Sequence, residues 1–247
     1  MDFATRLRNR LAVLDGTHRA KLRLNAPVAS FTFDDFPVSA CDVGGAMLEE
    51  AGARGTFFAN ASFHEQTVDG IPHYRTEHLK KLLASGHELG CHSFHHVRLG
   101  TKGAAFARQS AEENSAFMKK LLGEQFLMTS FAYPFGDASP GVKRAMARRF
   151  SLCRGVRQRT ITGDADLAQL SIVSLESRHW DEAVMRATIA EARASRSWLI
   201  FLTHDISESP TPYGSTPAML RTTLGLLKES AVEILTLKAA AAKGIFG

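Results

Sequence analysis

The chain has 247 residues, of which 45% are hydrophobic and 22% charged, a composition typical of an ordinary globular protein with enough apolar material for a core. Its 30 basic and 25 acidic residues give a formal net charge of +5, but the charge is spread along the chain, with dense basic groups only in "RLRNR" near the start and "KRAMARR" at 143–149. This distribution favours solvated helix faces over a nucleic-acid-binding surface.

The cysteine pattern and the first 25 residues indicate the cellular compartment in which the protein is expected. Cys41, Cys91 and Cys153 are odd in number and far apart, which argues against a disulfide framework or a cysteine zinc site and favours a reducing compartment. Arginines interrupt the first 25 residues, so no apolar run of the ~7 to 15 residues of a signal peptide is present there. No later segment reaches the ~18 apolar residues of a membrane span. We therefore expect a cytoplasmic protein; the sequence does not indicate its oligomeric state.

Short apolar runs rich in Val, Ile and Phe alternate with segments of helical spacing along the whole chain. A helical extension is expected in residues 1–25, before the main domain at 26–247. The expected strands are 28–33, 55–60, 87–92, 127–134, 151–156, 170–176, 198–204 and 232–237. The expected helices are 43–51, 77–85 after a Thr76 cap, about 101–122, one from Pro140 after a Ser139 cap, 182–195 after an Asp181 cap, and one opened by Thr216-Pro217.

About seven or eight β-then-α units without a linker indicate one parallel α/β domain, either an open doubly wound sheet or a barrel. The positions of reactive side chains favour the barrel. The pair Asp34 and Asp35, His92, the segment 133–136 and His204 each follow a predicted strand. In a (β/α) barrel such strand ends converge on one rim, where active sites are built.

The segment "HSFHH" contains His92 and His96, which are four residues apart. On one helical turn this spacing would place both imidazoles on the same face, as two ligands of one metal require. The alternative is that they fill ordinary hydrogen-bonded positions.

The adjacent carboxylates of Asp34 and Asp35 suit a His, His, Asp metal site, which needs one carboxylate as a ligand and can use a second as a base. An Asx-turn with a helix cap would explain one aspartate but not easily both. Spacing alone does not tell which aspartate has which role.

The motifs "SFTFDDFP", "GHELGCHSFHH", "FAYPFG" and "LIFLTHD" occur in this order. Together with "GTFFAN" and "VEILTL" they resemble the polysaccharide deacetylases of carbohydrate esterase family 4, over roughly residues 28–240. The resemblance implies a distorted (β/α) barrel of about seven strands. It also implies removal of the acetyl group from an N-acetylated sugar with a divalent metal, usually zinc, although cobalt or another divalent ion is compatible.

The resemblance also implies roles for individual residues. Asp35, His92 and His96 would hold the metal, and Asp34 would be the general base. The remaining implied roles are an oxyanion contact from the backbone N–H of Phe135, a general acid at His204, an acetyl-pocket border at Leu202, and further substrate contacts at Tyr133 and Trp180.

The chain departs from the family pattern in two motifs. Many members have an arginine in the third motif that steadies the catalytic aspartate, whereas this chain has Ala132 at that place. Arg178 or Arg154 could substitute. The fourth motif, in which an acidic residue and a tryptophan orient the histidine, is not clear; Trp180 and Asp181 are present, but Asp181 is already explained as a helix cap.

Several functions remain open from the sequence. The leading one is metal-dependent N-deacetylation of a carbohydrate. The alternatives are hydrolysis of another non-peptide C–N bond on the same fold, or a sugar-binding homologue that has lost turnover. A non-haem iron oxygenase conflicts with the βα pattern. The absence of an export signal suggests a soluble or lipid-linked precursor sugar as the substrate.

Overall fold

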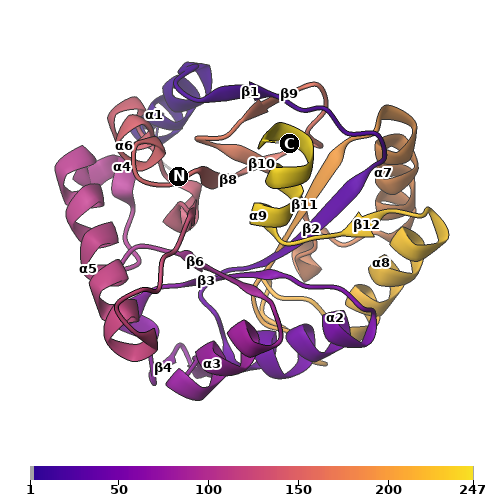
Figure 1. The fold of residues 1–247 in the computed structure, drawn as a ribbon, viewed down its shortest axis with the longest axis horizontal. Helices are drawn as coiled ribbons and strands as arrows, with labels where there is room; N and C mark the ends of the chain where they lie inside the picture. The colour runs from indigo at the N-terminus through magenta and orange to yellow at the C-terminus, as the bar shows by residue number, and fades with distance from the viewer. Residues whose placement is uncertain (1–2, 247) are drawn as a thin grey trace.

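Seven parallel strands close into a barrel in the computed structural model, which describes residues 3–246 (Figure 1). The barrel closes where β2 (Val28–Phe33) pairs with β11 (Trp198–Thr203) on one side and β3 (Thr56–Ala59) on the other. The expected (β/α) barrel is thereby confirmed. The other strands of the ring are β6 (Glu88–Cys91), β7 (Ser130–Ala132), β8 (Leu152–Gln158) and β10 (Leu170–Ser174).

The central pair of strands explains why the ring forms here. Every residue of β2 and β11 is buried, as expected of a parallel strand covered on both faces. Two polar contacts lie within the sheet: Thr32 donates to the Phe201 carbonyl oxygen at 2.6 Å, and the Trp198 indole N–H donates to Ser30 Oγ at 3.0 Å. Both strands end at the same rim, immediately before the reactive residues.

The last predicted strand, 232–237, is mostly not a strand. Only β12 (Glu233–Ile234) forms, and it pairs with the first two residues of β2 without joining the ring. Thr236 then caps α9 (Leu237–Ala241), whose buried side chains pack with Val28 and Trp198. In Figure 1, α9 lies over the centre of the barrel. The C-terminal segment therefore closes the amino end of the barrel, opposite the reactive rim.

Helices surround the ring (Figure 1). Three predicted caps are confirmed: Ser139, Asp181 and Thr216 each accept a hydrogen bond from a backbone N–H in the first turn of the helix that follows. The helices are a π-helical turn (Ala40–Gly45) leading into α2 (Ala46–Glu50), then α3 (Thr76–Ala84), α4 (Leu99–Lys102), α5 (Ala104–Leu122), α6 (Pro140–Ala147), α7 (Glu182–Ser195) and α8 (Pro217–Glu229).

Two helix boundaries differ from expectation. The cap of α3 is Arg75, and Thr76 is already the first helical residue. The stretch expected as one helix over about 101–122 is divided into α4 and α5 by Gly103, whose φ of +88° suits glycine and breaks the helical path.

The first 25 residues contain more than a helix. After α1 (Phe3–Leu14), strand β1 (Arg19–Lys21) pairs antiparallel with β9 (Asp164–Asp166). A separate small hairpin joins β4 (Thr67–Val68) and β5 (Ile71–Pro72). None of the helices in residues 3–246 combines the length and apolar character needed to cross a bilayer.

Candidate active site

The two aspartates follow β2 in a left-handed turn. In an extended strand, neighbouring side chains would point to opposite faces. Here Asp35 and Phe36 have φ values of +60° and +57°, which ends the strand and lets both carboxylates face His92. Non-glycine residues in this region are strained by about 1–3 kcal/mol each and are often found at functional sites. The burial of Phe36 between Phe57 and Tyr74 helps to hold the turn.

The two histidines come together in a loop and not on the helical turn expected from their spacing. Ser93 and His96 have φ values of +61° and +48°, which no α-helix contains. The ring centroids of His92 and His96 nevertheless lie 5.1 Å apart. The neighbouring His95 points elsewhere, to Glu113 at 3.2 Å. The structure therefore brings His92 and His96 together through a loop and not through a helical turn.

The arrangement of Asp35, His92 and His96 fits a divalent metal. Oδ1 of Asp35 is buried, and it lies 3.4 Å from His92 Nε2 and 2.9 Å from His96 Nε2. The possible ligand atoms of the three residues all lie within 4.8 Å of one another. His92 Nδ1 donates to the Ala132 carbonyl oxygen at 2.8 Å, which directs the lone pair of Nε2 toward the carboxylate, as in a metal-ligating histidine.

The charge states of the site agree with this assignment. Burial raises the pKa of Asp34, but Arg154, His92 and His204 outweigh it, so that the pKa of Asp34 lies below its ordinary value. Burial lowers the pKa of His92 to about 4. At neutral pH, Asp34 is therefore an ionised carboxylate that can accept a proton, and His92 is a neutral imidazole, the form that binds metals.

Arg154 takes the place of the arginine that the third motif lacks. Ala132 and Arg154 are directly opposite each other in the β7–β8 pairing, so the guanidinium comes from the neighbouring strand. It is fully buried, and its Nη2 donates to both carboxylate oxygens of Asp34. A charged residue inside the apolar strand "SLCRGV" was the sequence signal, because a buried arginine requires a partner.

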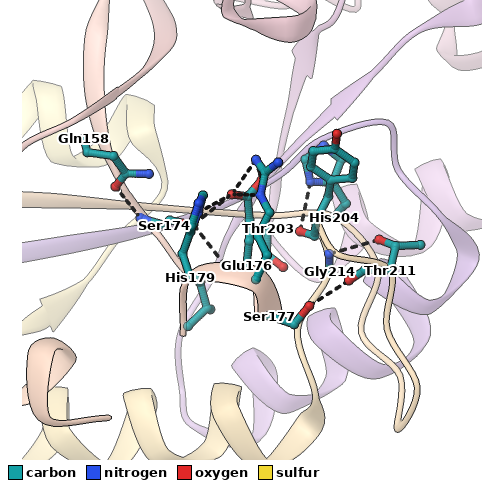
Figure 2. A network of polar contacts seen from close by, with 12 residues as sticks. Gln158, Ser174, Glu176, Ser177, His179, Thr203, His204, Thr211 and Gly214 are labelled. Carbon is teal, nitrogen blue, oxygen red and sulfur yellow. Dashed lines mark hydrogen bonds and ion pairs between the residues drawn. The ribbon is translucent and has the colours of Figure 1, made fainter. Parts of the chain in front are cut away.

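Arg178, the other candidate, does not contact Asp34. Its guanidinium donates to the buried Glu176 at 3.0 to 3.2 Å and stacks over the Tyr213 ring, 4.1 Å from its centroid. Figure 2 shows Glu176 among the polar residues after β10, bonded to Ser174 and beside His179.

If the site is catalytic, we expect Arg154→Met to lower kcat by about 10²-fold or more, because the Asp34 carboxylate loses the group that fixes its position. Removing one partner of a buried ion pair should also cost about 3 kcal/mol of unfolding free energy. Arg154→Lys should restore part of both. Chemical denaturation and initial rates measure the two effects, and the double variant Asp34→Asn/Arg154→Met should recover stability but not activity. A fully active Arg154→Met protein would contradict the assignment.

His204 follows β11 and faces the same cluster. Its Nε2 lies 3.9 Å from Asp35 Oδ2, and its Nδ1 lies 3.2 Å from the backbone carbonyl oxygen of Tyr213 (Figure 2). Since a carbonyl oxygen only accepts, Nδ1 carries the proton of that hydrogen bond. The backbone of Tyr213 therefore orients His204, which the sequence did not reveal.

The loop that carries Tyr213 is fixed by Asp205, a residue without a role in the sequence analysis. Asp205 is buried and accepts hydrogen bonds from the N–H and Oγ1 of Thr211 at 3.0 and 2.5 Å. A Cβ on Gly214 would lie 2.2 Å from Asp205 Oδ1, so only glycine fits there. Ser215 Oγ also lies 2.6 Å from Thr203 Oγ1 at the end of β11. These contacts hold the Tyr213 carbonyl in place.

Phe135 borders the histidines. Its ring lies 4.6 Å from that of His96 between centroids, and Arg98 stacks on it. Its φ of +57° falls within the short turn Pro134–Gly136. Backbone N–H groups at the start of such a turn lack partners inside it, which is compatible with the expected oxyanion contact.

The three residues expected to contact substrate differ in burial and in their distance from the site. Leu202 is buried at the rim end of β11. Trp180 is half-buried and packs against the hydrophobic core. The Tyr133 side chain does not reach the site: it is fully buried, and its hydroxyl donates to the Ala168 carbonyl oxygen at 2.9 Å. We therefore withdraw a substrate contact by the Tyr133 side chain.

Comparisons with known proteins bear on these observations. A family model described as "Polysaccharide deacetylase" matches residues 21–150, more than half of the chain. No curated protein matches the sequence.

Several solved structures have a similar fold. A family 4 acetyl xylan esterase from Clostridium thermocellum, in complex with a cobalt ion, has a TM-score of 0.59 at 18% identity, covering 87% of this chain and 90% of that one. The peptidoglycan deacetylase PdaC from Bacillus subtilis has a TM-score of 0.58 at 16% identity, covering 89% and 92%. A pseudoenzyme of the same esterase family from Bacillus anthracis has a TM-score of 0.61 at 15% identity, covering 92% and 68%.

Proposed function

Because the chain belongs to the polysaccharide deacetylase family, we propose that it hydrolyses the N-acetyl group of an N-acetylated carbohydrate with the help of a divalent metal. The observation that carries this proposal is the convergence of Asp34, Asp35, His92, His96 and His204 on one rim of the barrel. We assign residues 26–247 to the catalytic domain and residues 1–25 to an N-terminal extension.

Asp35, His92 and His96 would hold the metal. Nitrogen and carboxylate ligands suit zinc or cobalt, and we propose zinc first. A divalent cation held there supplies Lewis acidity, which polarises the acetyl carbonyl and makes a water molecule more acidic.

Asp34 would accept the proton of the attacking water. Its ionised state, maintained by Arg154, supports this role. The water oxygen forms a bond to the acetyl carbon, and the negative charge that develops on the carbonyl oxygen would be met by the backbone N–H of Phe135, a kind of donor worth about 3 kcal/mol in other enzymes.

His204 would complete the reaction as the general acid. Its Nδ1 is engaged by the Tyr213 carbonyl, so Nε2 is the nitrogen that faces the reacting groups. Protonation there allows it to donate to the nitrogen of the breaking C–N bond. The products are acetate and a sugar with a free amine. Leu202 would border the acetyl methyl group, and Trp180 is proposed as a more distant substrate contact.

We expect His204→Ala to leave metal affinity nearly unchanged while it lowers kcat on an N-acetylated sugar by roughly 10² to 10⁴. The loss should be smaller on an activated acetate ester, since its leaving group departs without a proton. Steady-state rates on both substrates measure the difference. Equal losses on the amide and the ester would argue against the general-acid role.

The overall proposal is tested by acetate release across a panel of N-acetylated sugars, with added zinc, cobalt or no metal. Release from at least one sugar that depends on metal is the expected result. A pseudoenzyme relative exists, but this chain retains each candidate group in one place, which supports turnover. Metal binding without acetate release from any member of the panel would favour the inactive sugar-binding alternative.

A further inference from the structure

Helix α1 exposes its apolar side. The exposed fractions are 80% for Phe3, 45% for Leu7, 47% for Leu11 and 69% for Leu14. With 3.6 residues per turn, these four side chains fall within an arc of about 80° around the helix axis. We call this set, Phe3, Leu7, Leu11 and Leu14, the apolar stripe. It accounts for almost half of the large hydrophobic side chains that the described residues expose.

The opposite side of α1, which is largely polar, is the one that packs on the protein. Thr5 and Ala12 are buried, and Asn9 Oδ1 accepts a hydrogen bond from the Ala138 N–H at 2.9 Å. Arg8 donates to Thr101 at 3.0 Å. A surface helix normally turns its apolar face to the core, and α1 does the reverse. The apolar stripe therefore does not serve the packing of this chain.

Contacts at the C-terminal end of α1 hold the helix in this orientation. Lys143, which is fully buried, donates from Nζ to the carbonyl oxygens of Ala12 at 2.8 Å and Asp15 at 2.5 Å, and to Asp166 at 2.5 Å. Carbonyl groups at the end of a helix have no partner within it, and a cation there is favourable. Helix α1 lies at the periphery of the molecule (Figure 1), and this attachment keeps the side chains of the apolar stripe exposed.

The charges beside the stripe indicate what covers it. Residues 3–14 contain three arginines and no acidic residue. Arg6 and Arg10 lie along one margin of the stripe and are exposed. An apolar helix face bordered by arginines is typical of helices that lie in the interface of an anionic bilayer.

We propose that α1 docks the protein on the surface of an anionic lipid bilayer. The apolar stripe would enter the boundary between headgroups and acyl chains, while Arg6 and Arg10 contact lipid phosphates. This proposal is independent of the deacetylation chemistry. A second copy of the chain is the weaker occupant, because antiparallel packing of two stripes would bring the Arg6 and Arg10 margins of both copies together.

Helix α1 packs beside loops that carry part of the candidate active site at the barrel rim. Thr101 and Ala138, which α1 contacts, lie in the segments that follow β6 and β7 and that also carry His96 and Phe135. A bilayer against the apolar stripe would therefore lie beside the flank of the candidate active site formed by these segments.

The test is co-sedimentation of the full chain with vesicles of phosphatidylcholine alone or with about a third phosphatidylglycerol. We expect binding to the anionic vesicles only, weakened at about 0.5 M salt. Leu7→Gln/Leu11→Gln should reduce partitioning about tenfold or more, and Arg6→Gln/Arg10→Gln should reduce it by a similar factor. The matched controls Leu127→Gln and Val184→Gln alter side chains that are 71% and 62% exposed elsewhere, and should bind as the wild type does.

Thermal melts followed by circular dichroism show whether each variant is folded, and sedimentation velocity reports oligomeric state. Wild-type protein that stays in the supernatant with anionic vesicles would overturn the proposal. So would folded Leu7→Gln/Leu11→Gln protein that binds vesicles normally. A wild-type dimer that this double variant converts to a monomer, without any vesicle binding, would assign the stripe to a second copy of the chain.

Discussion

Asp34→Asn should leave the protein loaded with metal and lower kcat by about 10³-fold or more. The substitution keeps the shape of the side chain and the proposed ligands Asp35, His92 and His96, but it removes the carboxylate that we propose accepts the proton of water. Added metal should not restore activity. Metal content by inductively coupled plasma mass spectrometry, measured on the same sample as acetate release, checks both parts.

The matched control is Asp205→Asn, which alters a buried aspartate in the loop near His204. Because Asp205 acts through the loop, its loss should lower activity less than Asp34→Asn does. If Asp34→Asn retained wild-type turnover, Asp34 would be only a turn residue paired with Arg154.

Asp35→Asn should fail in a different way. A neutral amide replaces the proposed anionic ligand, so metal affinity should fall. Loss of a residue that merely hydrogen-bonds to a ligand lowers metal affinity by roughly 10- to 100-fold, and loss of the ligand itself should lower it more. Activity should be low in stoichiometric metal and partly restored by an excess. Competition titration with a chromophoric chelator measures the affinity.

His95→Asn is the control for this variant, because His95 lies beside the site in sequence but is paired with Glu113 outside it. It should bind metal as the wild type does. If Asp34→Asn lost metal and Asp35→Asn kept it, the two roles would be exchanged while a metal site remained. If neither variant lost metal, Asp35 would not be a ligand.

Most of the strands and three of the helix caps were predictable because their signals are local. Strands such as β2 and β11 are continuous apolar runs, and Ser139, Asp181 and Thr216 occupy cap positions with the expected chemistry. The barrel could be inferred because each reactive group follows a strand. The short length of β12 could not be predicted. It pairs only with the first two residues of β2, and the sequence does not show that the later residues of β2 pair with β3.

The geometry of the candidate site was harder to predict from the sequence. The loop that joins His92 to His96 has left-handed residues that are not glycine, so nothing in the sequence marked it as non-helical. Arg154 was one of two candidates because its partnership with Asp34 depends on the β7–β8 register. Tyr133 lies within the motif "FAYPFG", but its side chain points into the core, which membership of the motif does not show.

The central claim is that a divalent metal held by Asp35, His92 and His96 is needed for hydrolysis. Its most direct test is acetate release by the wild type after the metal has been removed with a chelator and then returned in measured amounts. We expect the stripped protein to be folded and inactive, and about one equivalent of zinc or cobalt per chain to restore activity. Full activity in protein stripped of metal would contradict it.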